Sequence, residues 1–148
     1  MKIILALCLP RDEQAIPVSR HLAVTAMGEI GVTEDCIHDI AVALTEACTN
    51  VLKHSGPGDE FEISLDVDDN QCVIRVVDTG HGFDSESLGI GRADAAAEQG
   101  RGLELMRALV DKVKFVSKPE AGTVVYLEKV LEFESGSLAD LQRPPPRA

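Results

Sequence analysis

Hydrophobic and polar residues alternate most strictly in the segment 61–68. The apolar positions are Phe61, Ile63, Leu65 and Val67, and a polar or acidic residue stands between each pair. Because successive side chains of a strand point to opposite faces, this period of two predicts a strand with one buried face and one wet face. Turn residues at 68–70 and a second apolar run at 72–77 extend the prediction to a β-hairpin.

Other segments repeat their apolar positions every three or four residues, which is the period of an α-helix. The clearest of them starts after Thr33, a good N-cap, and stops at the Gly/Pro-rich turn that follows His54. A weaker helical pattern covers 12–30, and its expected inward positions are Ile16, Leu22, Ala23 and Ala26. A third helix is marked by Leu103, Met106, Leu109 and Val110.

Three more strands are expected at 3–9, 113–117 and 123–129. The resulting order of elements predicts an α/β (α+β) two-layer sandwich, in which a mostly antiparallel sheet carries three helices on one face. We assign this single domain to residues 1–133. The segment 134–148 is rich in Ser, Gly, Arg and Pro, and we expect it to be a disordered tail.

The formal net charge of the 148-residue chain is −11, and its Lys and Arg residues form no dense cluster. Direct binding to nucleic acid is therefore not expected. An acidic surface favours basic protein partners and fast association with them. An anionic ligand would need local positive potential from backbone N–H groups, a few basic side chains and a metal ion.

The four cysteines lie in apolar segments and form no C-x-x-C pair. We therefore expect reduced, buried thiols rather than a zinc site or disulfides. The apolar run at 3–9 is too short for the core of a signal sequence or for a membrane span. These features predict a cytoplasmic protein that does not bind membranes.

Three polar side chains recur at intervals of four in the clearest helix, namely Glu46, Asn50 and His54, so they share one helix face. Such a stripe is often only a solvated face. Asparagine is, however, a poor helix former, and it has no capping role in mid-helix. Its carbonyl oxygen suits a hard cation, and a carboxylate can take a proton or orient a water molecule. The stripe is therefore also a candidate metal and catalytic site.

Two Gly-rich turns carry further candidate chemistry. The first, Asp78-Thr79-Gly80-His81-Gly82, follows a strand, where Asp78 could accept an exocyclic amine and the glycines could let a flat ligand approach the backbone. The second, Gly100-Arg101-Gly102-Leu103, opens a helix, whose unpaired N–H groups and dipole suit a phosphate. Taken alone, each could be an ordinary turn or hinge, and Gly122-Thr123 could be a plain hairpin pair. No P-loop signature is present.

In this order, the stripe and the turns resemble the GHKL ATP-binding superfamily. Glu46-x-x-x-Asn50-x-x-x-His54 resembles its N box, and Asp78-x-Gly80-x-Gly82-Phe83 and Gly100-Arg101-Gly102-Leu103 resemble its two glycine boxes. Gly122-Thr123 matches the short motif before the last strand. The segments 45–54 and 100–111 are most similar to the anti-sigma factor serine/threonine kinases, the RsbW-like and SpoIIAB-like proteins. The resemblance implies a Bergerat-type ATP-binding fold.

The resemblance also implies a role for each candidate residue. Asn50 would ligate Mg²⁺, and Glu46 would act as a general base or orient a water molecule. Asp78 would accept the adenine amine with support from Thr123 through water. The residues expected to line the base pocket are Gly80 and Gly82, and those expected to receive the phosphates are Gly100, Arg101, Gly102 and Leu103. Residues 84–99 would form a lid over the nucleotide, and Lys53 and His54 would lie near the lid or the phosphates.

The cofactors implied by the resemblance are ATP and Mg²⁺. The implied function is that of an anti-sigma factor, which phosphorylates an anti-sigma factor antagonist on Ser or Thr and sequesters a sigma factor. By family analogy, an exposed first strand and an acidic face favour a homodimer. Two alternatives stay open: a catalytically weak ATP-binding regulatory module, and a detached histidine kinase catalytic domain, for which the segment before the N box shows no phospho-acceptor hairpin.

Overall fold

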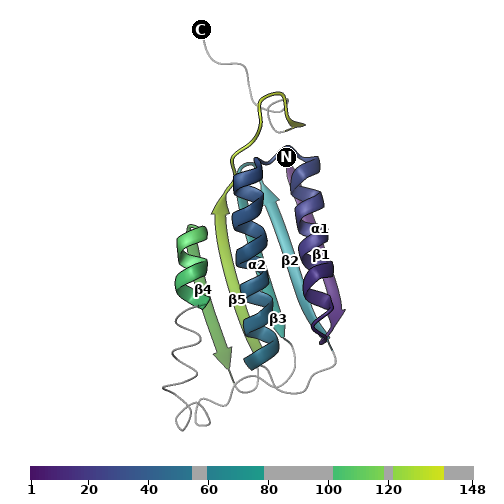
Figure 1. Cartoon of the computed structure of the whole chain (residues 1–148), viewed down its shortest axis with the longest axis vertical. Helices are drawn as coiled ribbons and strands as arrows, with labels where there is room; N and C mark the ends of the chain where they lie inside the picture. The colour runs from purple at the N-terminus through teal and green to yellow at the C-terminus, as the bar shows by residue number, and fades with distance from the viewer. Residues whose placement is uncertain (55–59, 79–101, 119–121, 139–148) are drawn as a thin grey trace.

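The computed structural model describes residues 1–54, 60–78, 102–118 and 122–138. The strands are β1 (Lys2–Pro10), β2 (Glu60–Asp68), β3 (Gln71–Asp78), β4 (Lys112–Lys118) and β5 (Gly122–Val130). The helices are α1 (Ala15–Glu29), α2 (Glu34–His54) and a third helix over 102–109. The three helices lie on one face of the sheet (Figure 1), which confirms the predicted two-layer fold. No helix in the described ranges is both long and apolar enough to cross a membrane.

The five strands form a single sheet in the order β1-β2-β3-β5-β4, and every neighbouring pair is antiparallel. In the β2–β3 hairpin, Asp68 pairs with Gln71, so the loop has two residues. Its first residue, Asp69, has a φ of 52°. Aspartate tolerates this left-handed backbone conformation, which lets the turn close the hairpin that the alternating pattern predicts.

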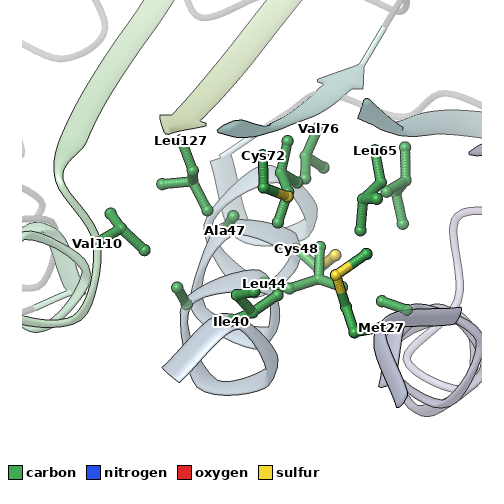
Figure 2. Close-up of a cluster of buried hydrophobic side chains, with 14 of the residues drawn as sticks. Met27, Ile40, Leu44, Ala47, Cys48, Leu65, Cys72, Val76, Val110 and Leu127 are labelled. Atoms are coloured by element: carbon green, nitrogen blue, oxygen red, sulfur yellow. The ribbon is translucent and has the colours of Figure 1, made fainter. Parts of the chain in front are cut away.

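Helix α2 lies between α1 and the third helix and supplies the centre of the core (Figure 1). Side chains with 0 or 1% exposure line its inner face, namely Ile40, Leu44, Ala47, Cys48 and Val51. Figure 2 shows this face against the strand residues Leu65, Cys72, Val76 and Leu127. Because the core holds this face of α2, the neighbouring face with Glu46 and Asn50 is held in a fixed direction as well.

The first helix differs from its prediction at its start and on its buried face. It begins at Ala15 rather than at Asp12, because the Asp12 carboxylate accepts a hydrogen bond from the Gln14 N–H at 2.8 Å and forms a turn instead. Leu22, a predicted inward position, is 38% exposed, whereas Met27 is fully buried. The prediction of the inward face is therefore wrong at Leu22.

The chain that follows β5 returns to the turn between α1 and α2. Phe133 pairs with Val32 in an isolated bridge, and the N–H of Glu134 donates to the carbonyl of Gly31 at 2.7 Å. These contacts lie on both sides of the predicted domain end at residue 133. Residues 139–148 lie outside the described residues, so the disordered tail stays a prediction.

Three of the four cysteines are buried as predicted, but Cys8 is exposed, and all four are free thiols. Cys8 occupies an outward position of β1, where its thiol donates to the Glu60 carboxylate at 2.6 Å. The prediction of a buried thiol is wrong at this position because the neighbouring residues Leu7 and Leu9 take the inward positions of the strand.

We expect iodoacetamide to modify only Cys8 in the folded protein near neutral pH. Burial raises the pKa of Cys48 and of Cys72 to about 12, and Cys36 is also buried. The hydrogen bond to Glu60 raises the pKa of Cys8 too. Because the thiolate is the reactive form, Glu60→Ala should speed the modification of Cys8, and the rate should rise with pH.

Mass spectrometry of the intact protein measures the number of modified thiols. Protein unfolded in guanidinium is the control, and it should react at all four cysteines. Modification of Cys48 or Cys72 in the folded protein would contradict the packing described above.

Candidate functional site

Two of the predicted motifs meet where the third helix begins. Gly102 is the first residue of this helix and is buried. A Cβ atom at this position would lie 3.2 Å from Nδ2 of Asn50 and 3.5 Å from Oε2 of Glu46. Since a side chain at this position would push against the Asn50 amide, glycine allows the start of the third helix to lie directly on the Glu46–Asn50 face.

Asn50 has binding capacity that the described part of the chain does not use. Asn50 is only 6% exposed, and its Nδ2 has no hydrogen-bond partner among the described residues. Leaving such a buried polar group unsatisfied costs about 1–3 kcal/mol. Groups of this kind in native proteins are typically completed by a ligand, an ion or water.

The donor set on this face of α2 fits a magnesium ion that is shared with a bound phosphate. The amide oxygen of Asn50 is a hard ligand, and the half-buried carboxylate of Glu46 lies one turn before it. Mg²⁺ commonly takes one or two protein oxygens and completes its octahedral shell with water and phosphate oxygens. The arrangement can therefore hold a metal, and it can also receive a proton at Glu46.

The threonines beside the stripe are engaged with their own helix. The hydroxyl of Thr45 donates to the Ala41 carbonyl, and that of Thr49 donates to the Thr45 carbonyl, both at 2.8 Å. Their protons are therefore used within α2, and the chemistry of the stripe rests on Glu46 and Asn50. His54 ends the helix, but its side chain lies outside the described residues.

Asp78 and Thr123 form a second polar pair, at the ends of two neighbouring strands. They are register partners in the β3–β5 ladder, and both residues are 0% exposed. Their position in the alternation of each strand puts them on the face that the helices cover, in line with Val76 and Val125. A carboxylate and a hydroxyl thus lie in the largely apolar layer between sheet and helices.

These two groups of residues lie at the same end of the molecule. The end of α2, the start of the third helix, the end of β3 and the start of β5 all lie at the lower end in Figure 1. The structure therefore gathers five predicted site residues at this end, namely Glu46, Asn50, Asp78, Gly102 and Thr123. Leu103, the next residue of the third helix, is half-buried.

Four predicted site residues lie outside the described residues, namely Gly80, Gly82, Gly100 and Arg101. The segment 84–99, predicted to be a lid, also lies outside them. The roles predicted for these positions stay predictions.

Arg11 is a basic residue at this end that the sequence patterns did not single out. Its Nε lies 3.9 Å from Oδ2 of Asp78, and its terminal nitrogen donates to the Leu52 carbonyl at 3.3 Å. The only sequence signal is an arginine directly after Pro10, which ends β1. The contact with Asp78 could not be foreseen, because it joins residues far apart in the chain.

An open cleft of about 550 Å³ adjoins Arg11 on the side of α1. Its lining includes the first turn of α1 and the last turns of α2, with Thr49, Leu52 and Lys53. Asn50, Asp78 and Thr123 do not line this cleft. The cleft is therefore a neighbour of the predicted nucleotide site and not the site itself, and Lys53 faces it.

The sequence matches the family model of the histidine kinase-like ATPase domain over residues 9–129. It is 31% identical over 133 residues to the serine-protein kinase RsbW of Halalkalibacterium halodurans, a match that covers 84% of this chain and 81% of the relative. It is 29% identical over 137 residues to the serine-protein kinase RsbW of Bacillus velezensis, covering 85% and 84% of the two chains.

Solved structures show the same fold. The RsbU and RsbW domains of a Mycobacterium tuberculosis protein match with a TM-score of 0.68 and 21% identity, covering 87% of this chain and 32% of that one. The histidine kinase domain of a blue-light-activated kinase from Erythrobacter litoralis matches with a TM-score of 0.52 and 17% identity, covering 83% and 62%. The chain therefore belongs to the histidine kinase-like ATPase domain family, and within the GHKL superfamily it is RsbW-like.

Proposed function

We propose that this protein is an anti-sigma factor that uses Mg-ATP to phosphorylate an anti-sigma factor antagonist on Ser or Thr, and that it sequesters a sigma factor. The observation that carries the proposal is the close approach of Gly102 to Asn50 and Glu46. This contact joins a helix N-terminus, which suits phosphate, to an amide and a carboxylate, which suit a metal and a proton. The similarity to RsbW serine-protein kinases supports the choice of acceptor.

The buried pair at the strand ends would recognise the base. Asp78 would accept a hydrogen bond from the adenine amine, and Thr123, its register partner, would support it through water. A charged acceptor in a buried position makes a strong hydrogen bond to a matching donor. It also excludes a base that lacks the donor, because the carboxylate would then lose hydration without gaining a partner.

The helix face would organise the phosphates and the acceptor. Asn50 would hold Mg²⁺ through its amide oxygen, together with phosphate oxygens. When bound, the ion would neutralise charge on the phosphates. Glu46 would take the proton of the attacking hydroxyl. Phosphoryl transfer depends mainly on positioning and charge stabilisation. A metal ligand and a general base are the kinds of group that it needs.

Protein partners would be recognised outside this site. The net charge of −11 favours partners with basic surfaces and speeds their encounter with the chain. The proposal includes a cytoplasmic location and a homodimer by family analogy.

Incubation with γ-labelled ATP and candidate antagonist proteins tests the proposal. Transfer of label to a Ser or Thr of the partner would support the kinase. Binding of ATP without transfer would favour a regulatory module instead, and labelling of a histidine in an added histidine kinase domain would favour a detached histidine kinase catalytic domain.

Asp78→Asn should weaken ATP binding by about tenfold or more while changing GTP binding little. The amide keeps the size of the side chain but lacks the charge that receives the adenine amine. Fluorescence competition with the two nucleotides measures both affinities. Asp66→Asn, on the outward face of β2, is the matched control. An equal loss of affinity for GTP would indicate a folding defect and would contradict the assignment.

A further inference from the structure

We infer that Arg11 is a positioning residue for base recognition, whose guanidinium group holds the Asp78 carboxylate oriented toward the exocyclic amine of adenine. This inference rests on the proposed nucleotide site. It adds a residue that lies outside the motifs from which that site was predicted.

Arg11 reaches Asp78 across the end of the sheet. Arg11 follows β1, and Asp78 ends β3, with β2 lying between these two strands. Because β1 pairs with β2 and β2 with β3 in antiparallel register, β1 and β3 run in the same direction and stop at the same end of the sheet. The side chain of Arg11 is only 10% exposed and that of Asp78 is 0% exposed. The contact is therefore nearly shielded from solvent.

A buried carboxylate needs such a neighbour. Moving an ionised carboxylate out of water is costly unless the charge is paired. The guanidinium group of arginine keeps its charge under all ordinary conditions. At 3.9 Å from Oδ2 of Asp78, it supplies an attraction that water would not screen strongly. Arg11 therefore offsets part of the cost of burying the Asp78 carboxylate and holds it beside a fixed positive charge.

The guanidinium group is itself fixed by the end of α2. It donates to the carbonyl of Leu52 at 3.3 Å, within the last turn of that helix. Carbonyl groups at a helix C-terminus attract cations, because they lack partners within the helix and carry the negative end of its dipole. With one contact to α2 and another to Asp78, Arg11 couples the position of the carboxylate to the helix that carries Asn50.

This role predicts an effect on base selectivity. Without the cation, the buried carboxylate loses its charged neighbour and turns toward other donors, which weakens its preference for an amine. A purely structural role for Arg11, in pinning the β1–α1 turn to α2, would lower the affinities for all nucleotides equally. The ratio of affinities for ATP and inosine triphosphate separates the two cases, because inosine carries a carbonyl group in place of the amine.

Calorimetric titration of the full chain with both nucleotides in Mg²⁺ tests the inference. The wild type should prefer ATP, and Arg11→Met should reduce that preference by about tenfold. Arg11→Lys should recover part of it, since it restores the charge. In the Asp78→Asn background, Arg11→Met should cause no further change, because the two residues would act through one contact. Arg75→Met, on the open face of the sheet, is the matched control and should behave as the wild type.

The outcomes separate this inference from the function on which it rests. Wild-type protein that binds both nucleotides equally would overturn the adenine site and the inference with it. If Arg11→Met prefers ATP over inosine triphosphate as strongly as the wild type does, the inference alone is overturned. An equal loss of affinity for both nucleotides in Arg11→Met would overturn it as well. If Arg11→Met fails to fold, Arg11→Gln still decides, because it keeps a donor for the Leu52 carbonyl without the charge. Wild-type selectivity in Arg11→Gln would overturn the inference.

Discussion

Replacing Glu46 with glutamine is expected to slow phosphoryl transfer by about 10²–10⁴-fold, the usual contribution of a general base. Glutamine keeps the shape of the side chain and its hydrogen-bonding capacity, but it cannot take the proton of the attacking hydroxyl. Binding of ATP should change little, because the carboxylate is proposed to act on the acceptor and not on the base or the metal. The rate of label transfer from ATP to the antagonist measures the effect.

The position of Glu46 supports this expectation. Its Oε2 faces Gly102, where the third helix begins and where the phosphates are proposed to lie. Glu62→Gln is the matched control, since Glu62 is exposed on the other face of the sheet. Equal transfer rates in Glu46→Gln and the wild type would exclude the general-base role and leave the protein as an ATP-binding regulator.

Replacing Asn50 with alanine is expected to remove the strengthening of ATP binding by Mg²⁺, with a loss of about tenfold or more in the presence of the ion. The variant lacks the amide oxygen that would hold the metal. It also lacks the buried Nδ2, which has no partner among the described residues, so the fold itself should lose little stability. The comparison is between ATP affinities in Mg²⁺ and in EDTA.

Asn70→Ala provides the matched control for this second variant. Asn70 is exposed in the β2–β3 turn, far along the chain from the stripe. The Asn70→Ala variant should retain the full difference in ATP affinity between Mg²⁺ and EDTA. If Mg²⁺ strengthens ATP binding by Asn50→Ala as much as it does for the wild type, the assignment of Asn50 as a metal ligand is contradicted.

Periodic patterns predicted most of the fold because one face of each element is buried. The alternation in β2 and the three- and four-residue spacing in α2 both follow from the same core, which Figure 2 shows. The weaker pattern of α1 led to an error at Leu22, because a helix with apolar residues on several sides does not reveal which side packs. Cys8 was mistaken for a core residue for a related reason, since an edge strand with apolar residues on both faces gives no alternation.

Local motifs indicated the candidate site, but they could not give its contacts. The spacing of Glu46 and Asn50 predicted a shared face, because helix geometry alone sets it. The approach of Gly102 to that face depends on packing between the third helix and α2, which no local pattern encodes. Arg11 was missed for the same reason. Its partners are the end of another strand and the carbonyl of a distant helix, and neither contact follows from residues near it in the chain.

The central claim is that the start of the third helix and the polar face of α2 together form the Mg-ATP site. Calorimetric titration with ATP in Mg²⁺ of the wild type, Gly102→Val and Gly28→Ala tests this claim most directly. A side chain at 102 would press on Asn50, whereas a Cβ at Gly28 would meet nothing within 4 Å. The account predicts tight binding by the wild type and Gly28→Ala, and a loss of about tenfold or more in Gly102→Val. A folded Gly102→Val variant that binds ATP in Mg²⁺ as tightly as the wild type would contradict this claim.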